Sequence, residues 1–292
     1  MGALNGKMQE YIKKASILVE ALPYIKEFSG ITVVIKYGGS VLLDENIKQT
    51  IIKDIALMKF VGMNPVVVHG GGPEINKMLE RVGIKSGFHN GLRITDAQTM
   101  EIVEMVLAGK AGKAIAGDIT MQGIPAISLS GKDAGLLKAE KITPDGVDIG
   151  FVGNVTQVNV PLIETLIEKG YVPVIASVGV DSFGQTYNIN ADYAAVAVAG
   201  ALKAGKLVFL TDVPGILKDP NDKNSLIPRI GAMEVKDMIE KGIITGGMIP
   251  KAECCMAGVE AGVLQVHILD GRVEHALILE IFTKDGIGTL VE

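Results

Sequence analysis

The feature that most constrains this chain is a run of apolar or β-branched residues, 31–35, which leads directly into Lys36-Tyr37-Gly38-Gly39-Ser40. The run has no polar alternation, which is typical of a strand buried on both faces of a parallel sheet. A buried strand rarely ends in lysine unless the charge has a partner. Paired glycines let backbone N–H groups approach a ligand oxygen closely. Because ligands of open α/β sheets bind at the carboxyl ends of strands, the segment predicts either an anion site or a tight turn beside a solvated lysine.

Composition narrows the class of protein further. Of the 292 residues, 48% are hydrophobic and 21% charged, which is typical of a globular protein. The net charge of −5 argues against general affinity for nucleic acid, so any phosphate binding has to be local. No stretch reaches the length of a membrane span, and the N-terminus lacks a signal-peptide pattern, so no membrane partner is expected. Cys254 and Cys255 are adjacent, which suits neither a disulfide nor a zinc site, and we expect a reduced, cytoplasmic protein.

Strand and helix patterns alternate along most of the chain. An amphipathic helix is expected after Asp44, a hairpin or lid over residues 83–95, and paired strands over residues 147–159. Further buried strands are expected at residues 65–69, 125–129, 172–177, 206–211, 265–269 and 288–291. This alternation predicts an α/β fold with a mostly parallel sheet that helices cover on both faces.

A helical stripe precedes the first strand and therefore lies outside this alternation. Apolar side chains recur at helical spacing over residues 8–28, and Pro23 predicts a kink or a split into two helices. The stripe packs either on the core of its own chain or on another subunit, and the sequence leaves both options open.

Two further glycine-rich junctions lead into helices. The strand that ends at His69 runs into Gly70-Gly71-Gly72-Pro73, where several N–H groups at a helix N-terminus form a ready anion site. His69 itself is expected to be packed and hydrogen-bonded rather than a base. Residues 246–251 open another helix and end in Lys251, a cation that the helix dipole disfavours there unless an anion binds.

Polar residues also mark the entry to the alanine-rich helix after residue 190. Helix capping would explain Asn190 or Asp192 alone, but not Asn188, Asn190 and Asp192 spaced to face one side of an extended entry. With the glycine junctions and lysines, this cluster favours phosphoryl transfer, in which positioning and charge neutralisation carry most of the catalysis. Residues 200–206 match most of a P-loop, but Leu207 replaces the required Ser or Thr and the segment follows a helix instead of a strand.

Five segments, taken in order, resemble the amino-acid kinase family, and within it the branch that phosphorylates N-acetyl-L-glutamate with ATP in arginine synthesis. They are Lys36-Tyr37-Gly38-Gly39-Ser40, His69-Gly70-Gly71-Gly72-Pro73, Asn90-Gly91-Leu92-Arg93, Asn188-Ile189-Asn190-Ala191-Asp192 and Gly247-Met248-Ile249-Pro250-Lys251. The resemblance runs from about residue 30 to the C-terminus and implies a three-layer α/β/α sandwich around an open eight-stranded sheet. It implies an N-terminal oligomerisation helix (1–29), an acetylglutamate-binding and dimerisation lobe (30–180) and an ATP-binding lobe (181–292).

The resemblance also implies roles for individual residues. Lys36 and Lys251 would contact the transferring phosphoryl group, and Asp192 would orient both lysines. The substrate would be held by Gly71, Gly72, Arg93, Asn188 and Asn190. ATP would lie along Gly38, Gly39, Thr211, Asp212 and Gly215. Magnesium would arrive with ATP, without a metal site of the protein itself. No general base is needed, because a γ-carboxylate with an ordinary pKa of about 4.3 is ionised at neutral pH.

Family members with the additional N-terminal helix resemble ring-shaped homohexamers, trimers of dimers, that arginine inhibits. The arginine site implied here consists of Tyr24, His275, Glu280, Gly286 and Gly288, with Glu280 paired to the arginine cation. Two alternatives remain open: a kinase for another acidic amino acid, such as glutamate or aspartate, and a non-catalytic amino-acid sensor of the same fold.

Overall fold

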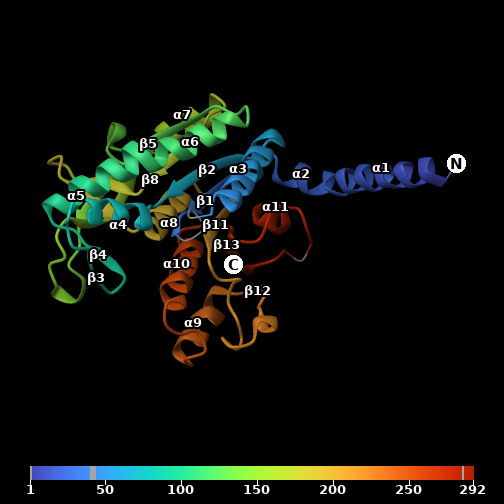
Figure 1. Cartoon of the computed structure of the whole chain (residues 1–292). Helices are drawn as coiled ribbons and strands as arrows, with labels where there is room; N and C mark the ends of the chain where they lie inside the picture. The colour runs from blue at the N-terminus through green and yellow to red at the C-terminus, as the bar shows by residue number, and fades with distance from the viewer. Residues whose placement is uncertain (1, 40–43, 285) are drawn as a thin grey trace.

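The computed structural model describes residues 2–39, 44–284 and 286–292, so Ser40 of the first glycine motif lies outside the described residues. β1 (Thr32–Tyr37) lies inside an eight-stranded sheet (Figure 1) with the order β12-β14-β13-β11-β1-β2-β8-β5. The other parallel strands are β2 (Asn64–His69), β5 (Ala126–Ser130), β8 (Val172–Ala176), β11 (Lys206–Thr211) and β13 (Gln265–Asp270). β14 (Thr289–Val291) runs antiparallel to β13, and β12 (Arg229–Ile230) pairs with β14. The predicted mostly parallel open sheet is confirmed.

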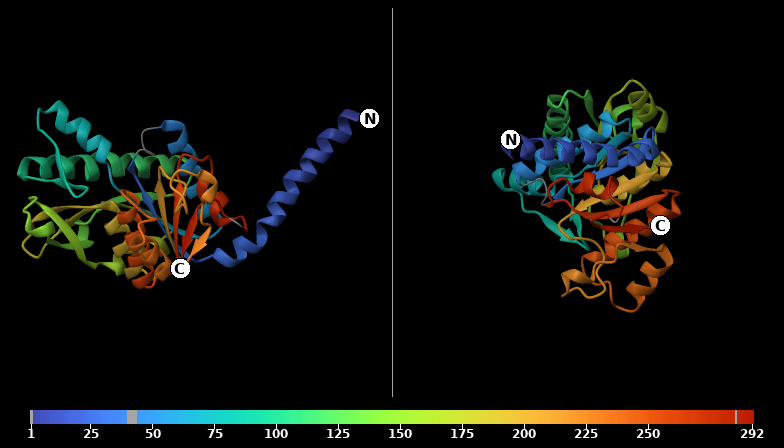
Figure 2. Two further views of the ribbon diagram at one scale, coloured as in Figure 1. Left: turned by 90° about the horizontal axis from the view of Figure 1, so that it is seen from below. Right: turned by 90° about the vertical axis from the view of Figure 1, so that its right-hand side faces the viewer.

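Helices cover both faces of this sheet, because alternate residues of the buried strands point to opposite sides. Val34 packs in one core with α7 (Val160–Glu168), α8 (Ala191–Ala201), α9 (Ala232–Glu240) and α10 (Met248–Glu260). Val33 and Ile35 pack in the other core with α3 (Glu45–Phe60), α6 (Gly112–Met121) and α11 (Ala276–Ile281). All three β1 residues are fully buried. The predicted three-layer α/β/α arrangement is therefore confirmed (Figures 1 and 2).

Smaller elements extend from the carboxyl edge of β2. α4 (Gly72–Arg81) leads to the hairpin of β3 (Gly87–His89) and β4 (Leu92–Ile94), which confirms the hairpin expected over residues 83–95. α5 (Ala97–Glu104) continues through a π-helical segment, Met105–Ala111, into α6. Four strands form a small separate closed sheet: β6 (Leu137–Lys141), β7 (Val152–Val158), β9 (Val178–Val180) and β10 (Thr186–Ile189).

The prediction of paired strands within residues 147–159 is wrong. Only β7 forms there, and its antiparallel partner is β6, whose sequence carries little strand signal. The turn before β7 lies directly against Thr95, which donates from its N–H to Ile149 O and accepts from Phe151 N. A Cβ on Gly150, whose φ is +82°, would lie 2.0 Å from the Thr95 carbonyl oxygen, so this close approach of two backbones requires glycine.

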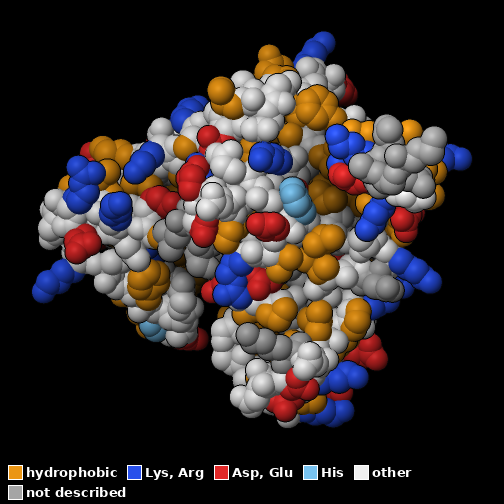
Figure 3. Space-filling view, turned by 45° about the vertical axis from the view of Figure 1, so that its right-hand side comes forward, with side chains coloured by type: hydrophobic (Ala, Val, Ile, Leu, Met, Phe, Trp, Pro, Cys, Tyr) orange, Lys and Arg blue, Asp and Glu red, His pale blue; other side chains and the backbone are white. Residues whose placement is uncertain are grey.

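The N-terminal stripe is split into α1 (Gly2–Glu20) and α2 (Leu22–Phe28), with Pro23 in the first turn of α2 as predicted. α2 reaches the core through buried Phe28. α1 projects away from the body of the molecule (Figure 2), so that Tyr11 is 59% and Leu18 71% exposed. On the face shown in Figure 3, hydrophobic side chains lie among intermixed acidic and basic ones. Within the described part of the chain, no helix combines the length and hydropathy needed to cross a bilayer.

Candidate active site

The glycine turns after β1 and β2 lie against each other at the carboxyl edge of the sheet. Tyr37 pairs with His69 in the register of the two strands, and Gly70 N donates to Tyr37 O at 3.3 Å. A Cβ on Gly38 would lie 3.5 Å from Gly70 N. A cavity of about 240 Å³ opens beside these turns. Of the predicted site residues, its wall includes Lys36, Gly38, Gly39, Gly71, Gly72, Arg93, Asn188, Asn190 and Asp192.

The buried-strand lysine has an acidic partner. Lys36 Nζ lies 2.9 Å from Asp192 Oδ1, and the two side chains are 13% and 24% exposed. Asp192 stands in the first turn of α8, where Asn190 caps the helix by accepting from Asp192 N at 2.8 Å. A half-buried carboxylate at a helix N-terminus therefore compensates the charge at the end of β1.

Arg93 lies on the wall that the β3–β4 hairpin supplies. Its side chain donates to Gly72 O at 3.3 Å and to Ser86 Oγ, and its guanidinium lies 4.8 Å from the centre of the Phe88 ring. Arg93 is 7% exposed, and this burial lowers its pKa, although a guanidinium stays charged at neutral pH. With five N–H donors it has more than these two hydrogen bonds need, which leaves a fork that suits a carboxylate.

Asn188 is connected to the strand that carries Arg93. Its Nδ2 donates to Thr95 Oγ1 at 3.1 Å, and Thr95 Oγ1 donates to Arg93 O at 2.7 Å. Thr95 is fully buried and was not singled out from the sequence, because its role depends on a residue 93 positions away. The two asparagines therefore have different partners: Asn190 caps α8, and Asn188 bonds to Thr95, the residue after β4.

Apolar residues that the sequence reasoning did not single out complete the wall. They are Ile75, Phe88, Leu92, Leu107, Val152 and Ile189. Leu107 comes from the π-helical segment, a rare conformation often found at functional sites. A Cβ on Gly71 would lie 2.7 Å from Leu107 Cδ2, so the glycine permits this contact beside the cavity.

Four predicted residues lie elsewhere. Lys251 on α10 is not among the described residues that line this cavity. Thr211, at the end of β11, bonds its hydroxyl to Val213 and so holds the following turn. Gly215 in that turn has φ +147°, and a Cβ there would lie 2.4 Å from Thr289 Oγ1. It lines a second, largely apolar cavity of about 190 Å³ together with Pro214 and Met248 at the start of α10, whereas Asp212 is exposed beside it.

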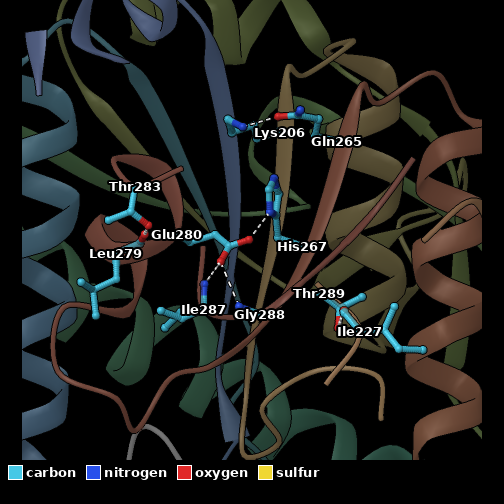
Figure 4. Close-up of polar contacts among 10 residues, drawn as sticks. All are labelled: Lys206, Ile227, Gln265, His267, Leu279, Glu280, Thr283, Ile287, Gly288 and Thr289. Atoms are coloured by element: carbon cyan, nitrogen blue, oxygen red, sulfur yellow. Dashed lines mark hydrogen bonds and ion pairs between the residues drawn. The ribbon is translucent and has the colours of Figure 1, made fainter. Parts of the chain in front are cut away.

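A third cavity, of about 530 Å³, lies between α2 and the β13–β14 edge of the sheet. Tyr24, Glu280 and Gly286 line it, as the arginine-site prediction requires. Glu280 is extensively bonded (Figure 4): Oε1 lies 2.7 Å from His267 Nδ1, and Oε2 accepts from Ile287 N and Gly288 N at 2.7 and 3.0 Å. Burial alone would raise the pKa of Glu280, but these hydrogen bonds hold it below its ordinary value.

The prediction that His275 lies in this cavity is wrong. His275 precedes α11 with φ +59° and faces α3, where its Nδ1 lies 2.6 Å from Asp54 Oδ1. His267 on β13 takes the predicted position, because strand alternation turns it toward the cavity beside Lys206. Burial lowers the pKa of His267.

Fold and site together define an α/β phosphotransferase: glycine turns, a lysine and an arginine surround one cavity at the carboxyl ends of parallel strands. A family model described as "Amino acid kinase family" matches residues 32–270. The chain belongs to the amino acid kinase family and is an enzyme with a carboxyl group as phosphoryl acceptor.

Individual relatives and structures agree with this assignment. The chain is 59% identical over 285 residues to the acetylglutamate kinase of Thermoanaerobacter sp. (strain X514), covering 98% of this chain and 95% of the relative. It is 54% identical over 292 residues to the acetylglutamate kinase of Carboxydothermus hydrogenoformans, covering 97% and 99%. It also resembles N-acetylglutamate synthase from Neisseria gonorrhoeae complexed with coenzyme A and N-acetyl-glutamate, with a TM-score of 0.84 and 26% identity. That match covers 95% of this chain but spans only 63% of the synthase chain.

Proposed function

We propose that this enzyme transfers the γ-phosphoryl group of ATP to the γ-carboxylate of N-acetyl-L-glutamate in arginine biosynthesis. The observation that carries the proposal is one cavity whose wall holds two cationic side chains from different elements, Lys36 of β1 and the buried Arg93 of β4. A dicarboxylate can direct one carboxylate to each of these side chains, although Asp192 already compensates the charge of Lys36. Relatives named acetylglutamate kinase, at 54–59% identity over nearly the whole chain, support this acceptor.

The walls of the cavity favour an acetylated amino acid over a free one. Asp192 is the only carboxylate among the described residues that line the cavity, and it is already paired with Lys36. A free glutamate or aspartate would bring an ammonium group whose charge needs a partner when it leaves water. The acetylated amine is neutral, and its methyl group suits apolar walls such as Leu107 and Leu92.

The chemistry needs charge compensation more than proton transfer. The acceptor carboxylate is ionised at neutral pH, so Asp192 orients Lys36 instead of acting as a base. Bringing an anion to a polyanion costs about 4 kcal/mol for each pair of unit charges at ~4 Å and an effective dielectric of ~20. Lys36 and the N–H groups of the two glycine turns are donors that offset this repulsion in the transition state.

ATP is proposed to extend from Gly38 and Gly39 toward the turn at residues 211–215 and the second cavity. In this proposal most of the acetylglutamate site belongs to a lobe of residues 30–180, with Asn188 and Asn190 added from the ATP-binding lobe of residues 181–292. Lys251 would then join the phosphoryl group from the ATP side when the lobes approach. Mg²⁺ is proposed to arrive bound to the nucleotide substrate. Among the described residues, no group of three or more His, Cys, Asp or Glu that could hold a metal ion occurs.

Regulation by arginine and assembly into a hexamer form the second part of the proposal. The exposed apolar side of α1 supports a role in joining dimers into a trimer of dimers. Arginine is proposed to bind in the third cavity, with Tyr24, His267 and Glu280 around it. Because its pKa is held low, Glu280 keeps the negative charge that an arginine cation requires. The buried, free cysteines suit a cytoplasmic location.

The deciding experiment measures ADP release with acetylglutamate, glutamate, aspartate or no acceptor, and traps the acyl phosphate with hydroxylamine. We expect ADP release and trapped product with acetylglutamate only. Comparable rates with glutamate or aspartate would favour a kinase for another acidic amino acid. Calorimetric binding of acetylglutamate without ADP release under any condition would favour the sensor alternative.

A further inference from the structure

Two buried polar side chains converge behind the glycine turn that follows β2. His69 ends β2 and is fully buried, and Ser128 on β5 is nearly so. Both face Gly112, the first residue of α6, which directly follows the π-helical segment. A Cβ on Gly112 would lie 2.4 Å from Ser128 Oγ and 2.9 Å from His69 Nε2. Glycine at position 112 therefore makes room for both polar groups.

The hydrogen-bonding state of His69 follows from its surroundings. Its Nδ1 lies 3.0 Å from Gly70 O, and because a carbonyl oxygen can only accept, Nδ1 carries the proton. Burial lowers the pKa of His69 to about 4, so the ring is neutral at pH 7. Nε2 is then a bare acceptor. Neither Nε2 nor Ser128 Oγ, a potential donor, has a hydrogen-bond partner among the described residues.

The position of Gly70 O matters for the site because a peptide unit is planar and trans. In such a unit the C=O of Gly70 and the N–H of Gly71 point in opposite directions. His69 holds the Gly70 carbonyl on the buried side, while Gly70 and Gly71 line the cavity. Because Gly70 O points to His69, the Gly71 N–H points away from the buried histidine.

We propose that Ser128 donates a hydrogen bond to His69 Nε2 after rotation about its Cα–Cβ bond, and that this pair positions the Gly71 N–H for the phosphoryl-transfer transition state. The proposed contacts run from Ser128 through the imidazole of His69 to the Gly70 carbonyl. They require glycine at position 112, because a side chain there would collide with both polar groups. Ser128 and His69 are positioning residues, since neither lines the cavity. The catalytic part of this inference rests on the proposed function.

The first test substitutes two glycines of the same helix. Gly112→Ala places a methyl group where Ser128 and His69 converge, whereas a Cβ on Gly117 meets no atom within 4 Å. We expect Gly112→Ala to lower kcat by more than about tenfold, since a misplaced donor to the reacting group weakens transition-state stabilisation. Gly117→Ala should keep the wild-type kcat. Equal kcat values for the two variants would overturn the proposal.

The second test removes only the hydroxyl group and guards against a folding defect in Gly112→Ala. Ser128→Ala should lower kcat about fivefold with an unchanged KM for ATP. Because one buried hydrogen bond is lost, the unfolding midpoint should fall slightly, but the variant should remain folded at the assay temperature. In ¹⁵N-histidine-labelled protein, the His69 Nε2 resonance should move to the value of a free ring nitrogen. A wild-type kcat would contradict the positioning role of Ser128, and an unmoved resonance would contradict the hydrogen bond between Ser128 and His69.

The resonance does not depend on activity, which separates the two proposals. If the resonance responds to Ser128→Ala in a protein that does not phosphorylate acetylglutamate, the hydrogen bond stands and the proposed function fails. If the enzyme is active and the resonance does not respond, the proposed function stands and the pair fails.

Discussion

Lys36 stands at the end of a strand whose preceding residues are fully buried, and its charge is balanced by Asp192 from a helix more than 150 positions away. The Lys36–Asp192 pair is partly exposed and faces the cavity. A substrate anion can therefore approach Lys36 while the lysine side chain stays where it is. A compact ammonium suits this role because it can follow a moving phosphoryl group.

Replacing Lys36 should therefore affect catalysis more than binding. For Lys36→Ala and for Lys251→Ala we expect kcat to fall by roughly 100-fold or more, with smaller changes in KM, by analogy with the loss of an oxyanion donor. Steady-state kinetics provide the measurement, with the exposed Lys53→Ala as the control. A near-normal kcat for either variant would remove that lysine from the proposed mechanism.

Arg93 should govern the acceptor and not the nucleotide. Lysine cannot reproduce the guanidinium fork or its position over the Phe88 ring, so Arg93→Lys should raise KM for acetylglutamate about tenfold or more. KM for ATP should stay nearly unchanged, and Arg81→Lys, on the exposed end of α4, should change neither. Equal increases in both KM values would place Arg93 outside the acceptor site.

At the scale of elements, short polar residues set where the helices begin around the site. Asp44 caps α3 by accepting from Asn46 N and Ile47 N, Asp96 caps α5, and Asn190 caps α8. Asn190 directly follows β10, and Asp96 follows β4 after one residue, Thr95; both strands carry site residues. Capping thus converts a strand end into a helix start at the edge where the cavity lies.

Removing one cap should destabilise the fold measurably. The Asp96 carboxylate accepts from Thr99 N at 2.8 Å, which also lowers the pKa of Asp96. Asp96→Ala should therefore cost about 1 kcal/mol in the free energy of unfolding, measured by urea denaturation. Asp96→Asn keeps an acceptor oxygen and should lose much less. A loss as large for asparagine as for alanine would show that the cap is not the cause.

At the scale of the whole molecule, α1 stands apart from the sandwich and exposes apolar side chains that the rest of the chain does not cover. α2 connects this helix to the cavity that Glu280 and His267 line. An oligomer held together through α1 would therefore communicate with the sheet edge through α2. Such coupling requires arginine to bind two states with different affinity.

Deletion of residues 1–26 should give active dimers that arginine does not inhibit. Tyr24→Ala removes one wall of the third cavity but leaves α1 in place, so it should preserve hexamers and weaken arginine inhibition. Light scattering and inhibition curves distinguish the two effects. Hexamers of the truncated protein, or its full inhibition by arginine, would refute the role proposed for this segment.

The stability of the whole fold should fall in mild acid. The pKa of buried His69 is lowered to about 4, against about 6.5 in an unfolded chain, so the unfolded state binds the proton first as pH falls. The neutral, buried His69 therefore contributes about 3 kcal/mol to the free energy of unfolding. This contribution is fully present above pH 6.5 and is lost as the pH falls from 6.5 to about 4. Burial of His267 acts in the same direction.

Urea denaturation between pH 7.5 and 4.5 measures this effect. His69→Gln, which does not titrate, should show a shallower decline of unfolding free energy with falling pH than the unaltered chain. An identical slope would mean that His69 is protonated in the fold or accessible in both states.

The sequence by itself determined the features that depend on near neighbours. The sequence patterns predicted seven of the eight strands of the main sheet, Asp44 predicted the start of α3, and Pro23 predicted the break between α1 and α2. The glycine turns after β1 and β2, Lys36, Asn188 and Asp192 were located as site candidates from the residues, and Arg93 from the family resemblance; all of them line one cavity, whereas the glycine turn before Lys251 does not. These signals are local because side-chain period, capping and proline geometry act within a few residues.

Only the tertiary structure decided which distant residues meet. Strand β6 lacks a strand pattern and forms because β7 lies beside it. His267, not His275, faces Glu280, because the direction of each side chain follows from the strand or turn that holds it. Thr95 reaches Asn188, Leu107 reaches Gly71, and Ser128 converges with His69 at Gly112 only after the sheet has assembled. Such contacts join segments far apart in the chain, and no short stretch of sequence contains the information that fixes them.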